Sequence, residues 1–321
     1  MEKIKSTAII ILNYNNYNDT INCIESVEKY NTAPIKYIIV DNGSSKKDSV
    51  ICIDKFLKKS FHDKYKCIIE GDKTDKLTYV TFLISKTNDG YAEGNNKGLR
   101  LANIDDEIEN ILILNNDILF VQDIIPELLN SLKSLDKAAI VSPLLYKKGL
   151  KELDYTCARL DYKCSYVFFQ YLFLYIDFFK ILSFYMKKQC FLINNPKLLN
   201  HRYVEIEMPS GSCMLMNKKF FYNIGFFDPN TFLYFEENIL FQKIRNKGYK
   251  NYLISNLKCI HLGASSSKTV PSLFTMKCNI DSCYYYFHKY KKNKFLCCFI
   301  KMMRPLILLK IKLRKNRCSY R

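Results

Sequence analysis

The chain has 321 residues, 48% of them hydrophobic, which is enough for one large domain or two small ones with a substantial core. Lys and Arg outnumber Asp and Glu by 49 − 31 = 18, a surplus that suits nucleic acid, anionic lipid or phosphorylated small molecules as partners. The 13 cysteines form no C-x-x-C pair and match no zinc-site or disulfide spacing, so a disulfide-stapled fold is excluded and free thiols in a reducing compartment are expected.

Short apolar runs in the first half of the chain predict buried strands at 8–12, 37–40, 79–84, 111–114 and 138–141. Segments with helical spacing separate them, at 19–30, 48–58, up to about Ala102, and 124–135, whereas the polar residues 63–76 are expected to form a loop. This alternation predicts an α/β fold with a mostly parallel sheet and helices on both faces. The first run is short, β-branched and without a cleavage site, so it predicts a strand and not a signal peptide.

Polar clusters follow the predicted strands, at 13–16, 41–45, 88–96 and 115–117. Because the carboxyl ends of parallel strands meet at one edge of the sheet, these clusters should line a ligand-binding edge. Asp117 offers a charged oxygen ligand for a hard divalent cation, although it could instead cap a following helix. No G-x-G-x-x-G follows the first strand, which argues against a dinucleotide fold.

The middle of the chain carries a long aromatic and aliphatic stretch at 166–186. Its length would span a bilayer, but Gln170, Asp177 and Lys180 interrupt it. We expect a helix that lies on a membrane or over a lipid-linked ligand, and the alternative is a helical cover over the sheet.

The last third of the chain predicts strands at 213–216 and 252–254, with a helix between them that ends near Lys247, before Gly248. The segment 295–321 alternates apolar with basic residues, and no acidic residue follows Asp281. A basic amphipathic helix on an anionic membrane explains both features, whereas a solvated charged helix leaves the Leu, Ile and Met content unexplained.

Taken together, the motifs resemble the family 2 glycosyltransferases with a GT-A fold, in particular their bacterial rhamnosyltransferase-like branch. The resemblance covers residues 6–290 and rests on five segments in the family's order: I-L-N-Y-N at 11–15, V-D-N-G-S-S at 40–45, N-x-G at 88–90 with G-N-N-x-G at 94–98, L-N-N-D at 114–117, and G-F-F-D at 225–228 with Y-F-E-E at 234–237. It implies a nucleotide-activated sugar donor, a divalent cation (Mn²⁺ or Mg²⁺) and inversion at the anomeric carbon.

The resemblance also implies roles for the residues of the donor side. Asp41 would accept a hydrogen bond from the imide N–H of a uracil or thymine base, beside Asn13 and Tyr14; a local Asx turn at Asp41 is the alternative and is compatible with binding. Gly90 would let the backbone approach the ligand closely, unless the segment is only a turn and a helix cap. The further donor-binding residues are Asn88, Asn95, Asn115 and Asn116.

On the catalytic side, the resemblance implies a metal-binding role for Asp117 at the family's D-x-D position, where Asn115 replaces the first Asp. His261 would be a metal or diphosphate ligand, or else a structural histidine. Glu237 stands where the family usually has an Asp as general base; Glu236 could do this work instead, and the pair could also be a merely favourable acidic helix start. Gly211 and Ser212 would line the acceptor side.

From this we expect four parts: a donor-binding half at 1–145, an aromatic-rich helical insertion at 146–206, a catalytic half at 207–281 and a membrane-associating tail at 282–321. The expected reaction is inverting transfer from a UDP- or dTDP-sugar, such as dTDP-rhamnose, to a lipid-linked or oligosaccharide acceptor in bacterial capsule or O-antigen synthesis. The enzyme would be peripheral at the inner face of the cell membrane. A catalytically weak paralogue acting as a partner subunit is the alternative; nucleic-acid binding is not expected, because the charge concentrates in an apolar tail.

Overall fold

A single mixed sheet forms the centre of the computed structural model, which describes residues 5–176, 187–263 and 272–319. Ten strands of the described chain join it, in the order β3-β4-β2-β1-β5-β11-β7-β12-β6, with β9 paired to β12. The strands of the first half are β1 Ser6–Asn13, β2 Ile35–Asp41, β3 Tyr65–Ile69, β4 Val80–Ile84, β5 Ile108–Asn115, β6 Ile118–Phe120 and β7 Ala138–Tyr146. Those that follow are β8 Ala158–Arg159, β9 Tyr203–Ile206, β10 Met208–Pro209, β11 Cys213–Asn217 and β12 Lys250–His261, where β8 and β10 pair separately.

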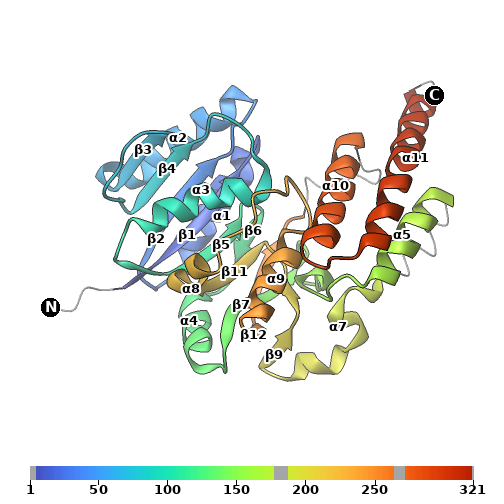
Figure 1. Ribbon diagram of the computed structural model, residues 1–321. Helices are drawn as coiled ribbons and strands as arrows, with labels where there is room; N and C mark the ends of the chain where they lie inside the picture. The colour runs from blue at the N-terminus through green and yellow to red at the C-terminus, as the bar shows by residue number, and fades with distance from the viewer. Residues whose placement is uncertain (1–4, 177–186, 264–271, 320–321) are drawn as a thin grey trace.

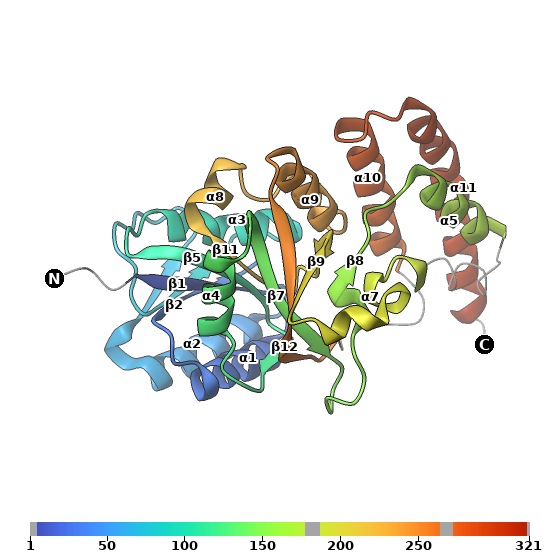
Figure 2. The ribbon, with the colours of Figure 1, turned by 90° about the horizontal axis from the view of Figure 1, so that it is seen from below.

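Helices cover both faces of this sheet (Figures 1 and 2). Their bounds are α1 Tyr17–Tyr30, α2 Lys47–Phe61, α3 Gly90–Asn103, α4 Ile125–Ser134, α5 Cys164–Ile176, α7 Phe191–Asn194, α8 Lys218–Asn223, α9 Glu236–Asn246, α10 Leu273–Lys289 and α11 Lys294–Ser319. Short 3₁₀ turns lie at His62–Lys64, Tyr155–Cys157 and Pro196–Asn200.

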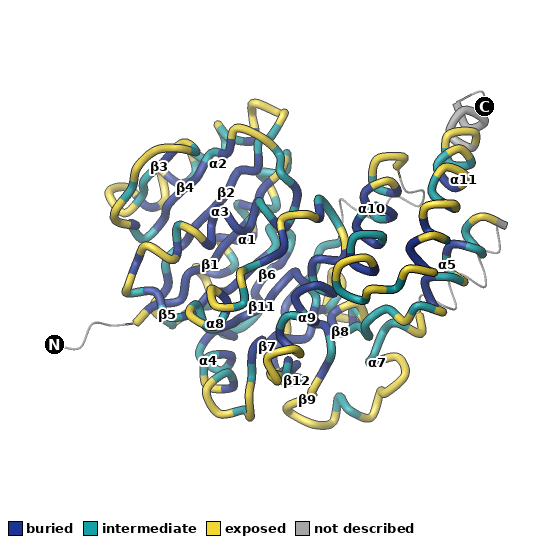
Figure 3. Tube along the Cα trace, in the orientation of Figure 1, coloured by how far each residue is buried: buried dark blue, intermediate teal, exposed yellow. Residues whose placement is uncertain are grey.

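The parallel half runs from β3 to β5, and its inner strands β4, β2, β1 and β5 are apolar on both sides because both sides are covered (Figure 3). In β1, Ile9 and Ile11 join the core beneath α1, α2 and α4, whereas Ala8 and Ile10 join the core beneath α3, α8 and α9. This period of two explains why the sequence shows a continuous apolar run. The expected α/β fold with a mostly parallel sheet is confirmed.

A third hydrophobic core lies beside the sheet, in the helical unit, by which we mean α5, α10 and α11 (Figure 1). Tyr166, Val167 and Tyr171 of α5 are buried there, so the described part of the aromatic stretch packs inward; residues 177–186 lie outside the described chain. In the ranges that the structure describes, no helix is both long and apolar enough to cross a bilayer.

Two carboxylates, the buried Asp228 and the partly buried Asp161, fasten the helical unit to the sheet domain. Asp228 accepts hydrogen bonds from the Tyr285 hydroxyl at 2.9 Å and from Lys289 Nζ at 3.0 Å. These hydrogen bonds, with those from Tyr290 and Asn230, hold the pKa of Asp228 well below its usual range despite the opposing effect of burial.

Asp161 plays the same part at the same C-terminal end of α10. It accepts from the Tyr286 hydroxyl at 2.7 Å, from Asn238 Nδ2 at 3.0 Å and from Gln242 Nε2 at 2.9 Å. Because α10 spans Leu273–Lys289, the boundary expected near residue 281 falls inside this helix.

The loop predicted for residues 63–76 is wrong in its first half, because β3 occupies Tyr65–Ile69 there. β3 is an edge strand in which only Ile68 is buried, so its sequence lacks the apolar run of a covered strand. After Asp117, the chain forms strand β6, which pairs with β12, and not the helix that Asp117 could have capped.

Candidate active site

The carboxyl ends of β1 and β2 form a rigid polar platform. Asn13 and Asp41 are register partners, and Asn13 Nδ2 donates to Asp41 Oδ2 at 2.7 Å and to Ser49 Oγ at 3.0 Å. The amide N–H of Ser44 donates to Asp41 Oδ1 at 2.9 Å. Asp41 is 0% exposed and both of its oxygens accept hydrogen bonds within the platform, whereas Tyr14 beside it is 46% exposed.

The loop that enters α3 adjoins this platform. Asn88 Oδ1 accepts from the Gly90 N–H and from Asn42 Nδ2, both at 3.0 Å. Gly90 has φ +80°, and a Cβ there would overlap the backbone carbonyl of Phe232. The Tyr91 N–H donates to the same carbonyl at 2.9 Å. Donor-side loop 88–91 and the catalytic-side segment before α9 are thus in direct contact.

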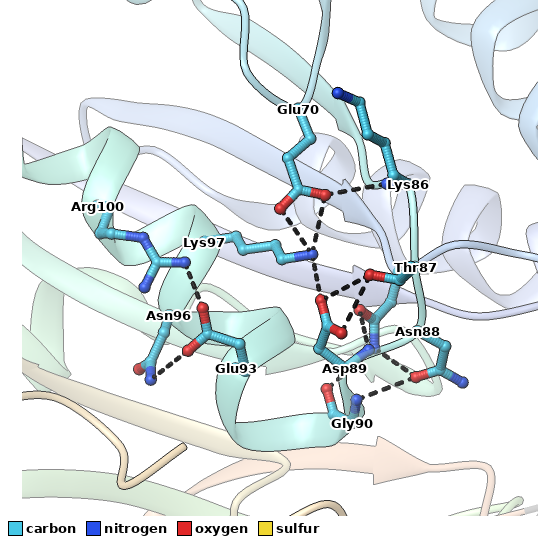
Figure 4. A network of polar contacts seen from close by, with 11 residues as sticks. Glu70, Lys86, Thr87, Asn88, Asp89, Gly90, Glu93, Asn96, Lys97 and Arg100 are labelled. Atoms are coloured by element: carbon cyan, nitrogen blue, oxygen red, sulfur yellow. Dashed lines mark hydrogen bonds and ion pairs between the residues drawn. The ribbon is translucent and has the colours of Figure 1, made fainter. Parts of the chain in front are cut away.

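Lys97 holds the outer side of this loop in place (Figure 4). Its Nζ lies 2.6 Å from Asp89 Oδ2 and 3.0 Å from Glu70 Oε1, and its side chain is 5% exposed. Burial lowers the pKa of Lys97, but the two carboxylates outweigh this and raise it, so the ammonium stays charged. Because Asp89 stands between Asn88 and Gly90, Lys97 fixes both predicted donor residues.

We expect Lys97→Met to lower the free energy of unfolding by about 2 kcal/mol, because it removes the charged donor shared by two carboxylates. Urea unfolding followed by circular dichroism measures this. The matched control is Lys58→Met, since the Lys58–Asp54 pair lies at the surface, where such pairs contribute about 0.5 kcal/mol or less. Equal effects of the two substitutions would contradict the assigned role.

A second cluster forms where β5, β6 and β12 meet. His261 Nε2 lies 3.4 Å from Asp117 Oδ2, and His261 Nδ1 lies 2.7 Å from Asp154 Oδ2. Burial lowers the pKa of His261, but the two carboxylates outweigh it and raise the pKa to about 9. Burial likewise opposes the effect of His261 and Thr156 on Asp154, whose pKa nevertheless falls to about 2.

This cluster fits a divalent cation. Asp117 Oδ1 is buried and has no hydrogen-bond partner among the described residues. Asp154 would hold His261 with Nε2 toward Asp117, which is the usual support of a metal-binding histidine. Because no group of three or more His, Cys, Asp or Glu suited to a metal occurs in the described ranges, Asp117 and His261 would need a ligand's oxygens to complete the coordination.

Glu237 lies at the start of α9, beside the turn that precedes β11. Its Oε1 accepts from the Gly211 N–H at 3.1 Å and lies 3.1 Å from an Arg159 terminal nitrogen. The Tyr91 hydroxyl donates to the Gly211 carbonyl at 2.7 Å, and the Ser212 carbonyl accepts from the Asn115 N–H at 2.8 Å. A Cβ on residue 211 would lie 2.9 Å from Glu237 Oε1, so only glycine leaves this carboxylate in place.

Glu236 differs from Glu237 in its burial and its hydrogen bonding. It is 5% exposed, its Oε1 has no hydrogen-bond partner among the described residues, and burial together with the adjacent Glu237 raises its pKa to about 8. Burial thus favours the protonated form of Glu236, whereas Glu237 faces a guanidinium. The preceding Tyr234 and Phe235 both have left-handed backbones, φ 73° and 69°, a conformation that strains non-glycine residues and gathers at functional sites.

The side chains of two predicted donor-binding residues form hydrogen bonds within the protein. Asn95 Nδ2 donates to the Tyr91 carbonyl in its own helix at 2.9 Å, and Asn116 Nδ2 donates to Thr20 Oγ1 at 3.0 Å. Their contact with a donor stays a prediction.

Arg159, Asp154 and the hydroxyl of Tyr91 are site groups that sequence reasoning missed. Arg159 and Asp154 lie in short irregular segments without a local pattern, and only the folded chain brings them to Glu237 and His261. Tyr91 had a signal, since it stands inside the 88–96 cluster.

Comparison with known proteins supplies the context for this geometry. The family described as "Glycosyl transferase family 2" matches residues 8–225. The solved structure of GalNAc-T7 with UDP, GalNAc and Mn²⁺ is similar in fold, with a TM-score of 0.60 and 14% sequence identity. The similarity covers 91% of this chain and 50% of that one, so this chain spans about half the length of that protein. No curated protein matches this chain significantly.

Proposed function

The chain belongs to the family 2 glycosyltransferases, and from this we propose that it transfers a sugar from a nucleoside diphosphate to an acceptor hydroxyl with Glu237 as general base. The observation that carries the proposal is the Glu237 carboxylate fixed by the Gly211 N–H and Arg159 on the catalytic side of the 88–91 loop. A base must be ionised to accept a proton, and Glu237 forms a direct ion pair with the Arg159 guanidinium at 3.1 Å.

In the proposed reaction, the acceptor oxygen attacks the anomeric carbon from the face opposite the diphosphate. The new carbon–oxygen bond forms as the bond to the diphosphate breaks, and the configuration inverts. The acceptor's proton passes to Oε2 of Glu237, because Oε1 already accepts a hydrogen bond from the Gly211 N–H. Protonated Glu236 keeps a second negative charge away from this base.

Asp117 and His261 would hold a divalent cation, Mn²⁺ or Mg²⁺, with Asp154 fixing the histidine ring. A cation there would neutralise the charge that develops on the leaving diphosphate. The family pattern has an Asp where this chain has the neutral Asn115. Asn115 Nδ2 donates to Ser212 Oγ at 3.3 Å and so stabilises the turn before β11.

The donor we propose is a UDP- or dTDP-sugar, since both bases offer an imide N–H to Asp41. For the acceptor we propose a lipid-linked or oligosaccharide chain in bacterial surface polysaccharide synthesis, at the inner face of the cell membrane. The basic, apolar C-terminal segment supports a membrane location, because each basic residue near an anionic surface contributes about 1 kcal/mol of attraction.

Thermal unfolding of the purified protein with UDP, dTDP, GDP or CMP, each with and without Mn²⁺, tests the donor site. We expect one pyrimidine diphosphate to raise the melting temperature, only with Mn²⁺, and Asp117→Ala to abolish the increase. Asp123→Ala is the control, because Asp123 is an acidic residue outside both clusters. No shift with any nucleotide in folded protein would favour the partner-subunit alternative.

A further inference from the structure

Helix α11 has two apolar faces, and among the residues that the structure describes only one of them packs against the rest of the molecule. Buried side chains on its inner face pack in the core of the helical unit: Leu296, Cys297, Ile300, Met303 and Ile307. A second set points outward and is exposed: Phe295 75%, Met302 58%, Leu306 39%, Leu309 56% and Leu313 56%. Intervals of three, four or seven positions place this second set on one line along the helix.

We infer that this outward line of α11 is a surface that binds an anionic lipid bilayer, with the helix lying in the plane of the membrane. The inference adds a membrane-binding surface to the proposed function. It rests on that function only where it concerns the nature of the acceptor. At about 1.5 Å per residue, the line from Phe295 to Leu313 is roughly 27 Å long, which is too long and too regular for scattered surface residues.

The charge beside the line identifies the occupant. After Asp281 the chain has twelve Lys or Arg and no Asp or Glu. Lys294, Lys301 and Lys312 are exposed on α11 and lie about a quarter of a turn from the apolar line. An apolar line bordered along one edge by exposed lysines matches the boundary between lipid headgroups and acyl chains.

Two other occupants fit less well. A second copy of the chain would bring the same lysines against each other, since a symmetric contact pairs a surface with itself. A nucleic acid would meet apolar side chains at the centre of the surface, where its phosphates need donors.

Co-sedimentation of the full chain with vesicles tests the inference. We expect binding to phosphatidylcholine vesicles that contain phosphatidylglycerol, at least tenfold weaker binding to phosphatidylcholine alone, and a decrease with added salt. The triple variant Met302→Ser, Leu309→Ser, Leu313→Ser should lose at least tenfold in binding to the anionic vesicles.

The matched control is Ile51→Ser, Ile69→Ser, Ile104→Ser, which removes three side chains with 47%, 52% and 42% exposure elsewhere on the surface. It should bind vesicles like the wild type. Equal loss in both variants, no preference for anionic vesicles, or a dimer that only the α11 variant abolishes would overturn the inference. Nucleotide-dependent stabilisation should be intact in both variants, so failure here is distinct from failure of the proposed transfer reaction.

Discussion

Glu237→Gln should reduce transfer by roughly 10²–10⁴-fold, the usual contribution of a general base. The amide has nearly the size of the carboxylate and can keep the contact with Gly211, but it cannot accept the proton of the attacking hydroxyl. The measurement is the initial rate of sugar transfer with saturating donor. Nucleotide-dependent thermal stabilisation of the variant should equal that of the wild type, which separates lost chemistry from lost binding.

Glu236→Gln is the matched control, one residue away. Because the pKa of Glu236 is about 8, its side chain is neutral at pH 7, and a neutral amide replaces it with little change in rate. As the pH rises through 8, the wild type gains a second negative charge beside Glu237, so its rate should change there while that of Glu236→Gln stays flat. A large loss in Glu236→Gln with a small loss in Glu237→Gln would reverse the assignment.

Arg159→Met should lower kcat by about 10²-fold, because a misplaced catalytic group costs about that much. Arg159 is a positioning residue: it lies 3.1 Å from Glu237 Oε1, and its Nε is buried without a partner in the described chain. The groups that face Glu237 are Arg159 of β8, Tyr91 of α3, Tyr162 and the neighbouring Glu236.

The split between kcat and KM, with rescue by the conservative variant, separates this role from a purely structural one. The kcat should fall in Arg159→Met and much less in Arg159→Lys, which keeps the charge but loses the guanidinium geometry. KM for the donor should change little in both variants. An unchanged kcat in a folded Arg159→Met protein would show that the guanidinium does not act on the base.

The sequence predicted β1, β2, β4 and β5 of the parallel half because each of these strands is covered on both sides and therefore forms an apolar run. It could not predict β3, β6 or β8: β3 is an edge strand, and the other two have three and two residues, too few for a pattern. β12 was predicted only at 252–254, whereas it runs from Lys250 to His261 and brings His261 beside Asp117.

Some residues of the candidate site could likewise be predicted from the sequence, and others could not. Asp117 and Glu237 stand at strand and helix ends within motifs, so their place could be predicted. Asp154 lies 107 positions before its partner His261, and nothing local indicates that pairing. The sequence also left Glu236 and Glu237 equivalent, since only burial and the position of Arg159 distinguish them.

Asp228 and Asp161, the carboxylates at the C-terminal end of α10, limit how this enzyme can be re-engineered. A chimaera that received α10 and α11 from another chain would keep Asp161 and Asp228 but lose the Tyr and Lys donors that satisfy them. An uncompensated buried charge costs about 3–5 kcal/mol, a large part of the stability of a typical domain. The C-terminal helices are therefore not an exchangeable module. Substitutions intended to change the cellular localisation should be made at the outward side chains of α11, and α10 should be left unchanged.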